Sequence, residues 1–306
     1  MDFTAPLPVT LRQLQYIVAV ADLGGFRRAA EACHVSQPSL SVQVRQAEEA
    51  LGVRLYERDR RGVRPSTAGV ALIAQARAVL LATADLREMA RLVADPFSGT
   101  LRIGVIPTIS PYLLPEIAPA LSRAYPRLTV VWSEDRTSGL VRQLHEGTLD
   151  VAILALGADL GGLDHAVLLH DPFLLAASPA HPLAASSRRA RVDDLRDANV
   201  LLLEDGHCFR DQALQLCASH GAREAGFRAT SLPTLVQMAS AGAGVTLLPS
   251  IAVPVENRRG QLVVRPFAPP GPGRTIALAW RRGSALASSL IRLAESMREA
   301  VKTRGA

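Results

Sequence analysis

The stretch that decides the fold of the N-terminal part of this chain is residues 26–52, FRRAAEACHVSQPSLSVQVRQAEEALG. It predicts a short helix over residues 26–33 and a second helix that begins after Ser36, because serine is a favoured N-cap residue. Pro38 suits the first turn of that helix, and Gly52 is a natural C-terminal stop. Two helices joined by so short a connection are typical of a helix-turn-helix, although an ordinary helical hairpin has the same pattern.

A basic segment follows the second helix. Residues 54–64 hold five arginines against two carboxylates, which gives the segment a local charge of +3. Gly62 and Pro65 mark turns within and after it. The segment therefore predicts a β-wing that lies against a phosphate backbone, with a solvated basic loop as the alternative.

Residues 67–95 predict one long helix, in which apolar side chains recur every seven residues at Leu72, Val79, Leu86 and Val93. Such a repeat favours pairing with another helix as in a coiled coil. Packing of the helix on its own domain is the alternative.

Strands and helices alternate after a break at residues 95–99. Strands are expected over residues 101–106, 128–132, 151–156, 168–177, 200–204, 244–248 and 275–280, and helices over 115–125, 138–146 and 285–301. This alternation predicts an α/β domain with a largely parallel sheet.

The chain as a whole has 306 residues, which corresponds to about two or three domains. Its 34 basic and 28 acidic residues give a net charge of +6, which is compatible with a nucleic-acid partner. Three cysteines are too few for a disulfide scaffold. We find neither a signal-peptide pattern nor an uninterrupted apolar run near the ~18 residues of a membrane span, so we expect a soluble, cytoplasmic protein.

The run at residues 36–41, SQPSLS, with Glu48, Leu55 and Arg58 after it, resembles the signature of the LysR-type transcriptional regulators. The resemblance extends over the whole chain. It implies an N-terminal winged helix-turn-helix plus a long linker helix, and a C-terminal α/β regulatory domain with two lobes, like a periplasmic binding protein. The implied boundaries are 1–66 for the DNA-binding domain, 67–95 for the linker and dimerisation helix, and 99–306 for the regulatory domain, with lobe 1 at about 99–170 and 275–306 and lobe 2 at about 171–274.

A narrower resemblance lies at residues 203–213, LEDGHCFRDQA, which are similar to the hydrogen-peroxide-sensing members of that family. A second cysteine, Cys217, follows Cys208 nine residues later. The resemblance implies a regulator rather than an enzyme, one that activates oxidative-stress genes through a reversible disulfide with Cys208 as the peroxidatic and Cys217 as the resolving residue. One departure is Gly226, where those members often have a histidine.

The residues themselves support a reactive thiol at Cys208. It precedes a helix-like stretch over residues 211–219, and a helix N-terminus stabilises a thiolate. His207 and Arg210 are expected to add positive charge nearby, whereas an inert buried cysteine is the alternative. If the intervening residues are helical, a rise of about 1.5 Å per residue holds the two cysteines roughly 13 Å apart, beyond the ~7 Å that a disulfide allows. Oxidation must then unwind part of residues 208–217.

A peroxide pocket is expected at the carboxyl ends of the strands, where ligands of such folds collect. Thr108 and Thr137 each follow one of the first two strands of the α/β domain. The resemblance implies pocket roles for Thr108, Thr137, His207, Asp211 and Arg274. For each threonine, a helix cap or a turn is the alternative role.

The DNA contacts that the resemblance implies come from the second helix and the wing. They are Ser36, Gln37, Pro38, Ser39, Ser41, Val42, Arg45, Arg58, Arg60, Arg61 and Arg64. The acidic Glu48 and Glu49 are expected to face away from DNA, and Cys33 is expected to pack in the core, apart from the redox chemistry.

The implied partners are double-stranded DNA with paired half-sites, hydrogen peroxide as effector, and further copies of the chain in a homodimer or homotetramer. RNA polymerase and a thiol reductant such as glutaredoxin or thioredoxin are also implied, whereas no cofactor, metal ion or membrane is expected. Two other functions stay open. One is a LysR-type regulator that answers a small metabolite bound between the lobes, and the other is a thiol peroxidase.

Overall fold

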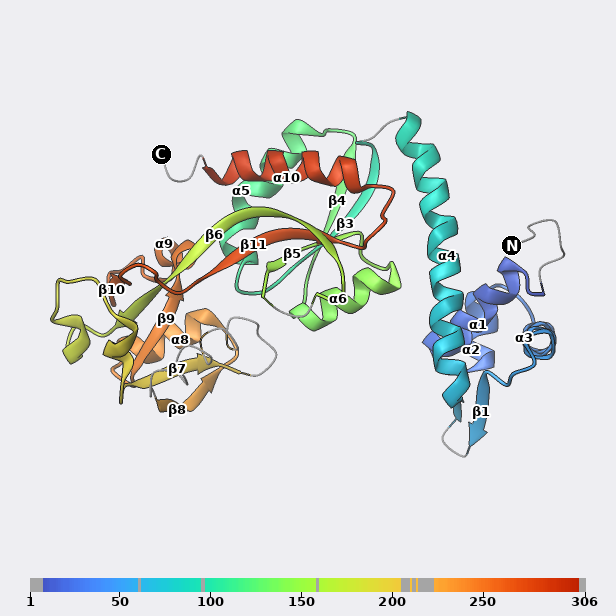
Figure 1. Ribbon diagram of the computed structural model, residues 1–306, viewed down its shortest axis with the longest axis horizontal. Helices are drawn as coiled ribbons and strands as arrows, with labels where there is room; N and C mark the ends of the chain where they lie inside the picture. Colours follow the sequence, from blue (N-terminus) through green and yellow to red (C-terminus); the bar gives the residue numbers. More distant parts are fainter. Residues whose placement is uncertain are drawn as a thin grey trace. The chain divides into compact units, whose positions relative to one another are not determined.

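The computed structural model describes residues 8–59, 62–94, 97–157, 160–204, 210, 213 and 223–302 (Figure 1). The chain divides into two compact units, Met1–Arg91 and Leu92–Ala306. The first unit contains α1 (Leu11–Leu23), α2 (Phe26–Ala32), α3 (Gln37–Leu51), the hairpin strands β1 (Tyr56–Asp59) and β2 (Gly62–Pro65), and all but the last three residues of the long helix α4 (Thr67–Ala94).

The helix-turn-helix prediction is confirmed. The side chain of Ser36 caps α3 by accepting a hydrogen bond from the backbone N–H of Ser39. Gly52 ends the helix in the left-handed conformation, at φ 67°, which an L side chain rarely adopts. Leu40 and Val44 of α3 are buried against α1 and α2, so the apolar stripe of α3 faces the core of the unit.

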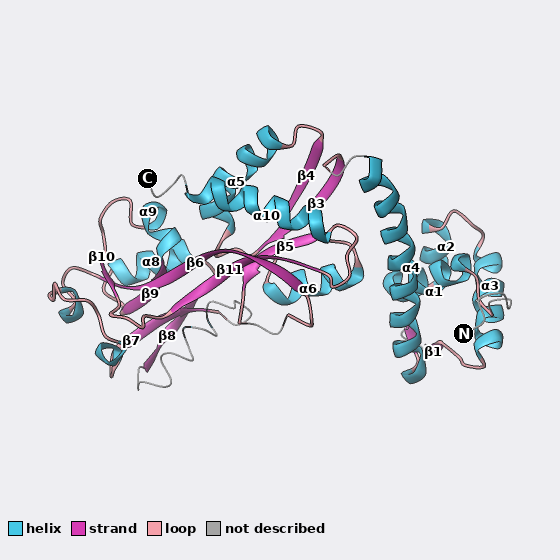
Figure 2. Cartoon of the chain, turned by 45° about the horizontal axis from the view of Figure 1, so that its top comes forward, coloured by secondary structure: helices cyan, strands magenta, loops and turns pink. Residues whose placement is uncertain are grey.

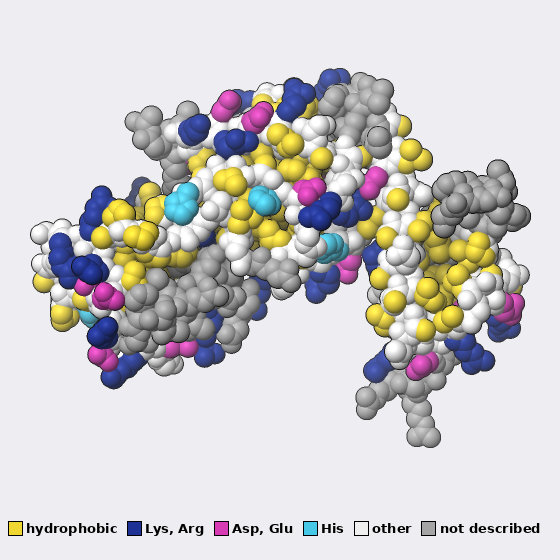
Figure 3. All heavy atoms as spheres, in the orientation of Figure 1, with side chains coloured by type: hydrophobic (Ala, Val, Ile, Leu, Met, Phe, Trp, Pro, Cys, Tyr) yellow, Lys and Arg dark blue, Asp and Glu magenta, His cyan; other side chains and the backbone are white. Residues whose placement is uncertain are grey.

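The predicted long helix is also present, as α4. Its first turns belong to the N-terminal core, because Ile73 and Ala76 are buried there and Arg77 pairs with Asp22 of α1. Further along, Val79 and Leu86 are exposed. Figure 3 shows hydrophobic side chains at the surface along this helix. By length and composition alone, Thr67–Leu86 is apolar enough to cross a membrane, with a mean hydropathy of 1.5. An exposed apolar stripe on α4 also suits pairing with a second helix, as in a coiled coil.

The second unit is built on one sheet. Its strands are β3 (Gly99–Val105), β4 (Leu128–Glu134), β5 (Val151–Ala155), β6 (Asp164–Ala177), β7 (Asn199–Leu203), β8 (Arg223–Ala229), β9 (Val245–Pro249), β10 (Val263–Pro266) and β11 (Gly273–Trp280). They follow the order β4-β3-β5-β11-β6-β9-β7-β8, and β10 pairs with β6. The helices are α5 (Ser110–Ala124), α6 (Thr137–Glu146), α8 (Leu232–Ser240), α9 (Val253–Glu256) and α10 (Ala287–Lys302).

The expectation of a largely parallel sheet is wrong. β3 pairs in parallel with β4 and β5, and β7 does so with β8 and β9. In contrast, β11 pairs antiparallel with β5 and β6, and β6 pairs antiparallel with β9 and β10. The sheet is mixed because the chain passes from one half of the unit to the other along β6 and returns along β11. These two long strands, visible in Figure 1, therefore run in opposite directions.

Two hydrophobic cores lie along this sheet. Figure 2 shows its strands and the helices beside them. The first, which we call lobe 1, contains buried side chains of β3, β5, α5 and α10. The second, lobe 2, contains those of β7, β9, α8 and the end of β6. The strands β8 and β10 were not expected from the sequence, because their exposed and half-buried positions lack a continuous apolar run.

Candidate DNA-binding surface and interlobe cavity

The face of α3 opposite its buried stripe is polar and accessible. Gln37 lies on it and donates a hydrogen bond from Nε2 to the hydroxyl oxygen of Ser41 at 2.9 Å. Ser41 is half-buried, and the other predicted contacts of this helix are exposed, namely Ser36, Gln37, Pro38, Ser39, Val42 and Arg45. A helix with one apolar face in the core and one polar face free is the arrangement that enters a DNA major groove.

The predicted wing is the antiparallel hairpin of β1 and β2. Arg64 lies exposed on β2. Arg58 lies on β1, but its side chain is outside the described residues, as are Arg60 and Arg61. Arg58 and Arg64 therefore lie on the wing, whereas the wing position of Arg60 and Arg61 stays a prediction from the sequence.

Glu48 has a structural role that sequence reasoning missed. Its Oε1 accepts hydrogen bonds from the backbone N–H groups of Leu55 at 2.7 Å and Tyr56 at 3.4 Å, where the chain enters the wing. The carboxylate thereby fixes the direction of the wing relative to α3. From the sequence, Glu48 was expected only to face away from DNA, because a carboxylate is repelled by phosphate.

Tyr56 holds the base of the wing from the other side. Its hydroxyl donates to the backbone carbonyl of Ile17, and its ring packs edge-on against Phe26 with centroids 5.9 Å apart. Burial raises the pKa of Tyr56 well above its usual range, with a smaller contribution from Glu48. The phenol therefore stays neutral and remains a donor at any physiological pH.

A cavity of about 470 Å³ lies between the lobes of the second unit. It forms where β3, β4 and β7 end and where α5, α6 and α8 begin. Its lining includes Pro107, Thr108, Pro111, Tyr112, Glu134, Asp135, Arg136, Leu203, Glu204, Thr230, Ser231, Leu232 and Pro233. This is the edge of the sheet at which ligands of α/β folds bind.

One polar contact joins two residues of the cavity wall, and a second joins the cavity-lining Tyr112 to a residue outside the lining. Arg136 at the start of α6 forms an ion pair with Glu204 after β7. The Tyr112 hydroxyl on α5 donates to the carboxylate of Glu256 on α9 at 2.7 Å. Burial and this hydrogen bond raise the pKa of Tyr112 above its usual range.

Of the predicted pocket residues, Thr108 and Arg274 come together. Nη1 of Arg274 donates to the Thr108 hydroxyl oxygen at 2.7 Å, and Nη2 donates to the Thr108 carbonyl at 2.9 Å. Thr137 is 8% exposed at the first position of α6, and its hydroxyl has no hydrogen-bond partner among the described residues. His207 and Asp211 lie outside the described residues.

The two cysteines of the predicted switch, Cys208 and Cys217, also lie outside the described residues. Arg210 is described between them, and its side chain is 4% exposed. It donates to the carbonyl of Leu203 at 3.0 Å and pairs with Glu224 of β8 at 2.9 Å. Glu224 thus pairs with the charge of Arg210. The expectation that Arg210 lends positive charge to Cys208 stays a prediction, because Cys208 lies outside the described residues. The hydrogen bond from Arg210 lowers the pKa of the Glu224 carboxyl.

The third cysteine, Cys33, is half-buried and packs against the core of the first unit as expected. Among the described residues, no group of three or more His, Cys, Asp or Glu side chains is placed to hold a metal ion.

Two family descriptions match this chain. "Bacterial regulatory helix-turn-helix protein, lysR family" matches residues 11–70, and "LysR substrate binding domain" matches residues 94–302. The hydrogen peroxide-inducible genes activator of Dickeya chrysanthemi is 47% identical over 292 residues, which is 95% of each chain. The DNA-binding transcriptional dual regulator OxyR of Escherichia coli strain K12 is 46% identical over 291 residues, again 95% of each chain.

Solved structures match as well. A full-length OxyR from Pseudomonas aeruginosa with a cysteine-to-aspartate substitution is 37% identical, covers 95% of both chains and has a TM-score of 0.76. The reduced and the oxidised forms of OxyR are 43% and 44% identical and both have a TM-score of 0.61. They cover 67% and 68% of this chain and 97% and 98% of their own.

Proposed function

Since this chain belongs to the LysR family of bacterial transcriptional regulators, we propose that it binds promoter DNA and activates oxidative-stress genes when hydrogen peroxide oxidises Cys208. The observation that carries the proposal is the match over 95% of the chain to a hydrogen peroxide-inducible genes activator. The chain also has two cysteines nine residues apart, Cys208 and Cys217, which supports the proposed disulfide.

The DNA side of the proposal is supported by the first unit. The exposed face of α3 supplies Gln37 and Arg45 for base edges, and the wing supplies Arg64 for a phosphate. A homodimer or homotetramer joined through α4 would present two such units to paired half-sites. RNA polymerase and a reductant such as glutaredoxin or thioredoxin complete the proposed set of partners, in the cytoplasm.

The redox side is supported by two described residues, Glu204 and Arg210, that stand before and after Cys208 in the sequence. Glu204 lines the interlobe cavity, and Arg210 reaches back to the carbonyl of Leu203, which lines the same cavity. Cys208 follows Glu204 by four residues, and four extended residues span at most about 14 Å. Glu204 and Arg210, the nearest described residues before and after Cys208 in the sequence, thus both meet the wall of the cavity that contains Thr108, which supports a peroxide reaction at this cavity.

In the proposed reaction, the thiolate of Cys208 attacks one oxygen of hydrogen peroxide. The S–O bond forms as the O–O bond breaks, giving a sulfenic acid and hydroxide, which takes up a proton to become water. The thiol of Cys217 then attacks the sulfenic sulfur, forming the disulfide and releasing a second water. A dithiol reductant then reduces the disulfide and is itself oxidised to a disulfide, which returns the protein to its starting state. The proposed role of this cycle is that of a sensor, with DNA binding as its output.

The decisive experiment is peptide mass spectrometry of the full chain after brief exposure to stoichiometric hydrogen peroxide, without reductant. A Cys208–Cys217 disulfide with Cys33 still free is expected. The Cys208→Ser variant should bind promoter DNA and lose the peroxide response. Unchanged induction in that variant would reject Cys208 as the sensor.

A second candidate is a LysR-type regulator of a small metabolite, which the interlobe cavity favours because about 470 Å³ is far more room than peroxide needs. Under this alternative, stoichiometric peroxide would leave the thiols of Cys208 and Cys217 unreacted. A thiol peroxidase, by contrast, would consume peroxide with many turnovers when a reductant is supplied.

A further inference from the structure

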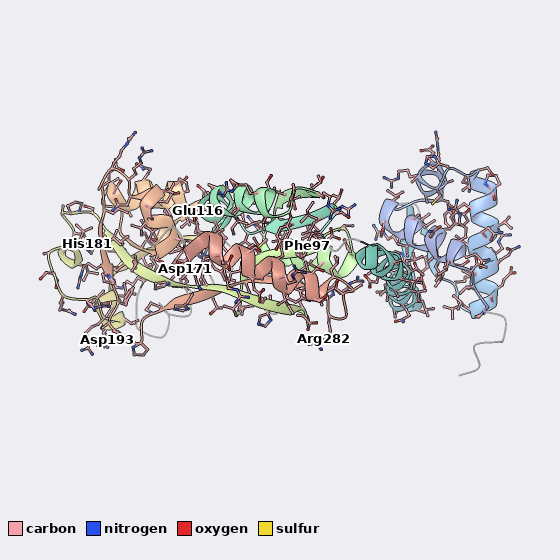
Figure 4. All side chains as sticks on the ribbon, turned by 90° about the horizontal axis from the view of Figure 1, so that it is seen from above. Phe97, Glu116, Asp171, His181, Asp193 and Arg282 are labelled. Carbon is pink, nitrogen blue, oxygen red and sulfur yellow. The ribbon has the colours of Figure 1, made fainter. Side chains whose placement is uncertain are left out.

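A buried polar chain joins the wall of the cavity to both lobes. The side chains of Asp171 on β6 and Arg274 on β11 are each 0% exposed, and Nε of Arg274 donates to Oδ2 of Asp171 at 2.9 Å. The two residues are direct cross-strand neighbours. Figure 4 labels Asp171 on β6, the strand that passes from one lobe to the other.

The other oxygen of Asp171 is also fixed. Oδ1 accepts a hydrogen bond from the hydroxyl of Ser250 at 2.9 Å and another from the backbone N–H of Ile251 at 3.1 Å. Both donors follow β9 in lobe 2. Asp171 is therefore held by lobe 2 on one side and holds Arg274 on the other, so its carboxylate has little freedom to turn.

Arg274 in turn decides which way the Thr108 hydroxyl can act. Two guanidinium N–H groups occupy the hydroxyl oxygen and the carbonyl oxygen of Thr108. Because a guanidinium is always a donor, the hydroxyl hydrogen of Thr108 must point away from it. Thr108 lines the cavity, so this hydrogen is available to an oxygen atom bound there.

We propose that Asp171 is a positioning residue for the peroxide reaction: by fixing Arg274, it sets the Thr108 hydroxyl as a hydrogen-bond donor into the cavity. This inference rests on the proposed function. During the attack of the thiolate, negative charge develops on the leaving peroxide oxygen, and a prealigned donor stabilises that charge. Asp171 itself touches neither peroxide nor the thiol.

The test compares two reactions of Cys208 in the full-length protein. The first is its oxidation by hydrogen peroxide, which needs the donor. The second is its alkylation by iodoacetamide across pH, which reports the accessibility and ionisation of the thiol but uses no oxyanion donor. Both rates are followed by quenching and peptide mass spectrometry.

Thr108→Val is expected to slow the peroxide reaction about tenfold, the effect of one lost hydrogen bond near 1.4 kcal/mol, whereas Thr108→Ser keeps the hydroxyl and the rate. Asp171→Asn should slow the oxidation of Cys208 by peroxide to a similar extent. Adding Thr108→Val to that variant should not slow the oxidation further. Ser250→Ala removes one bond to Asp171 without changing any charge, so a smaller loss of about threefold is expected. Alkylation should stay within about twofold throughout.

Equal loss of peroxide and alkylation rates in Asp171→Asn would assign it a merely structural role and overturn the inference. So would losses that multiply in the double variant, because Asp171 would then act independently of Thr108. If Asp171→Asn fails to fold, an unchanged peroxide rate in Ser250→Ala or in Thr108→Val overturns the inference alone. A wild-type protein that does not react with peroxide removes the proposed function and this inference together.

Discussion

Neutralising Glu224 should make the proposed disulfide harder to reduce. Arg210 lies between Cys208 and Cys217 in the sequence, and two of its guanidinium nitrogens reach the carboxylate of Glu224 at 2.9 Å and 3.4 Å. Because oxidation is expected to unwind part of residues 208–217, this anchor belongs to the reduced state. The Glu224→Gln substitution removes the charge and keeps the shape of the side chain.

The magnitude follows from burial. Breaking a fully buried pair costs about 3–5 kcal/mol, but the Glu224 side chain is 27% exposed and that of Arg210 only 4%. Arg210 also keeps its bond to the Leu203 carbonyl. We therefore expect a loss of about 2 kcal/mol from the reduced state alone. That corresponds to a potential about 40 mV more negative, or a roughly 30-fold shift of the equilibrium towards the disulfide.

The assay is equilibration of the full-length protein in dithiol buffers of graded potential, with the disulfide quantified by alkylation and mass spectrometry. The matched control is Asp197→Asn, which breaks an ion pair with Arg223. The side chain of Arg223 is 71% exposed and that of Asp197 is 69% exposed. Exposed pairs contribute little, so this control should leave the potential unchanged. A potential for Glu224→Gln that equals the wild-type value or lies above it would refute the reasoning, because the Arg210 anchor would then persist in both states.

Three further outcomes test other parts of the structure. Arg45→Ala should reduce the discrimination between the right and the wrong base pair at one operator position by about 1–3 kcal/mol. Arg64→Ala should instead weaken binding to all DNA sequences alike and reduce by about one the slope with which the binding constant falls with salt. Binding titrations at several salt concentrations test both. Glu48→Ala leaves the N–H of Leu55 without its acceptor and should cost about 1–3 kcal/mol, while Glu48→Gln should cost less; thermal unfolding of the two variants compares them. Because the pKa of Glu224 is lowered in the folded state, its ionic stabilisation is complete above the unfolded value near 4.3 and is lost as pH falls through the folded value. Urea unfolding from pH 6 to pH 3 should therefore bring the stability of the wild type towards that of Glu224→Gln, and a constant gap would contradict the assignment.

The amino-acid sequence alone was sufficient for the features that depend on local signals. Ser36 and Gly52 predicted the two ends of α3 correctly, because capping and left-handed backbone conformations are properties of single residues. The long helix α4 was also predicted correctly, because its seven-residue apolar repeat lies within one continuous segment and can be recognised without knowing what the helix packs against.

Tertiary structure decided the features that depend on distant segments. The sheet is mixed because β6 and β11 connect the lobes in opposite directions, and nothing within either strand encodes the direction of its neighbour. Glu48 meets the start of the wing and Arg210 meets Glu224 only after folding, so neither contact has a sequence signature. The same holds for Asp171. In the sequence it is an ordinary carboxylate within a strand, and it becomes a buried partner of Arg274 because antiparallel pairing places the two side chains side by side, where an uncompensated charge would be costly.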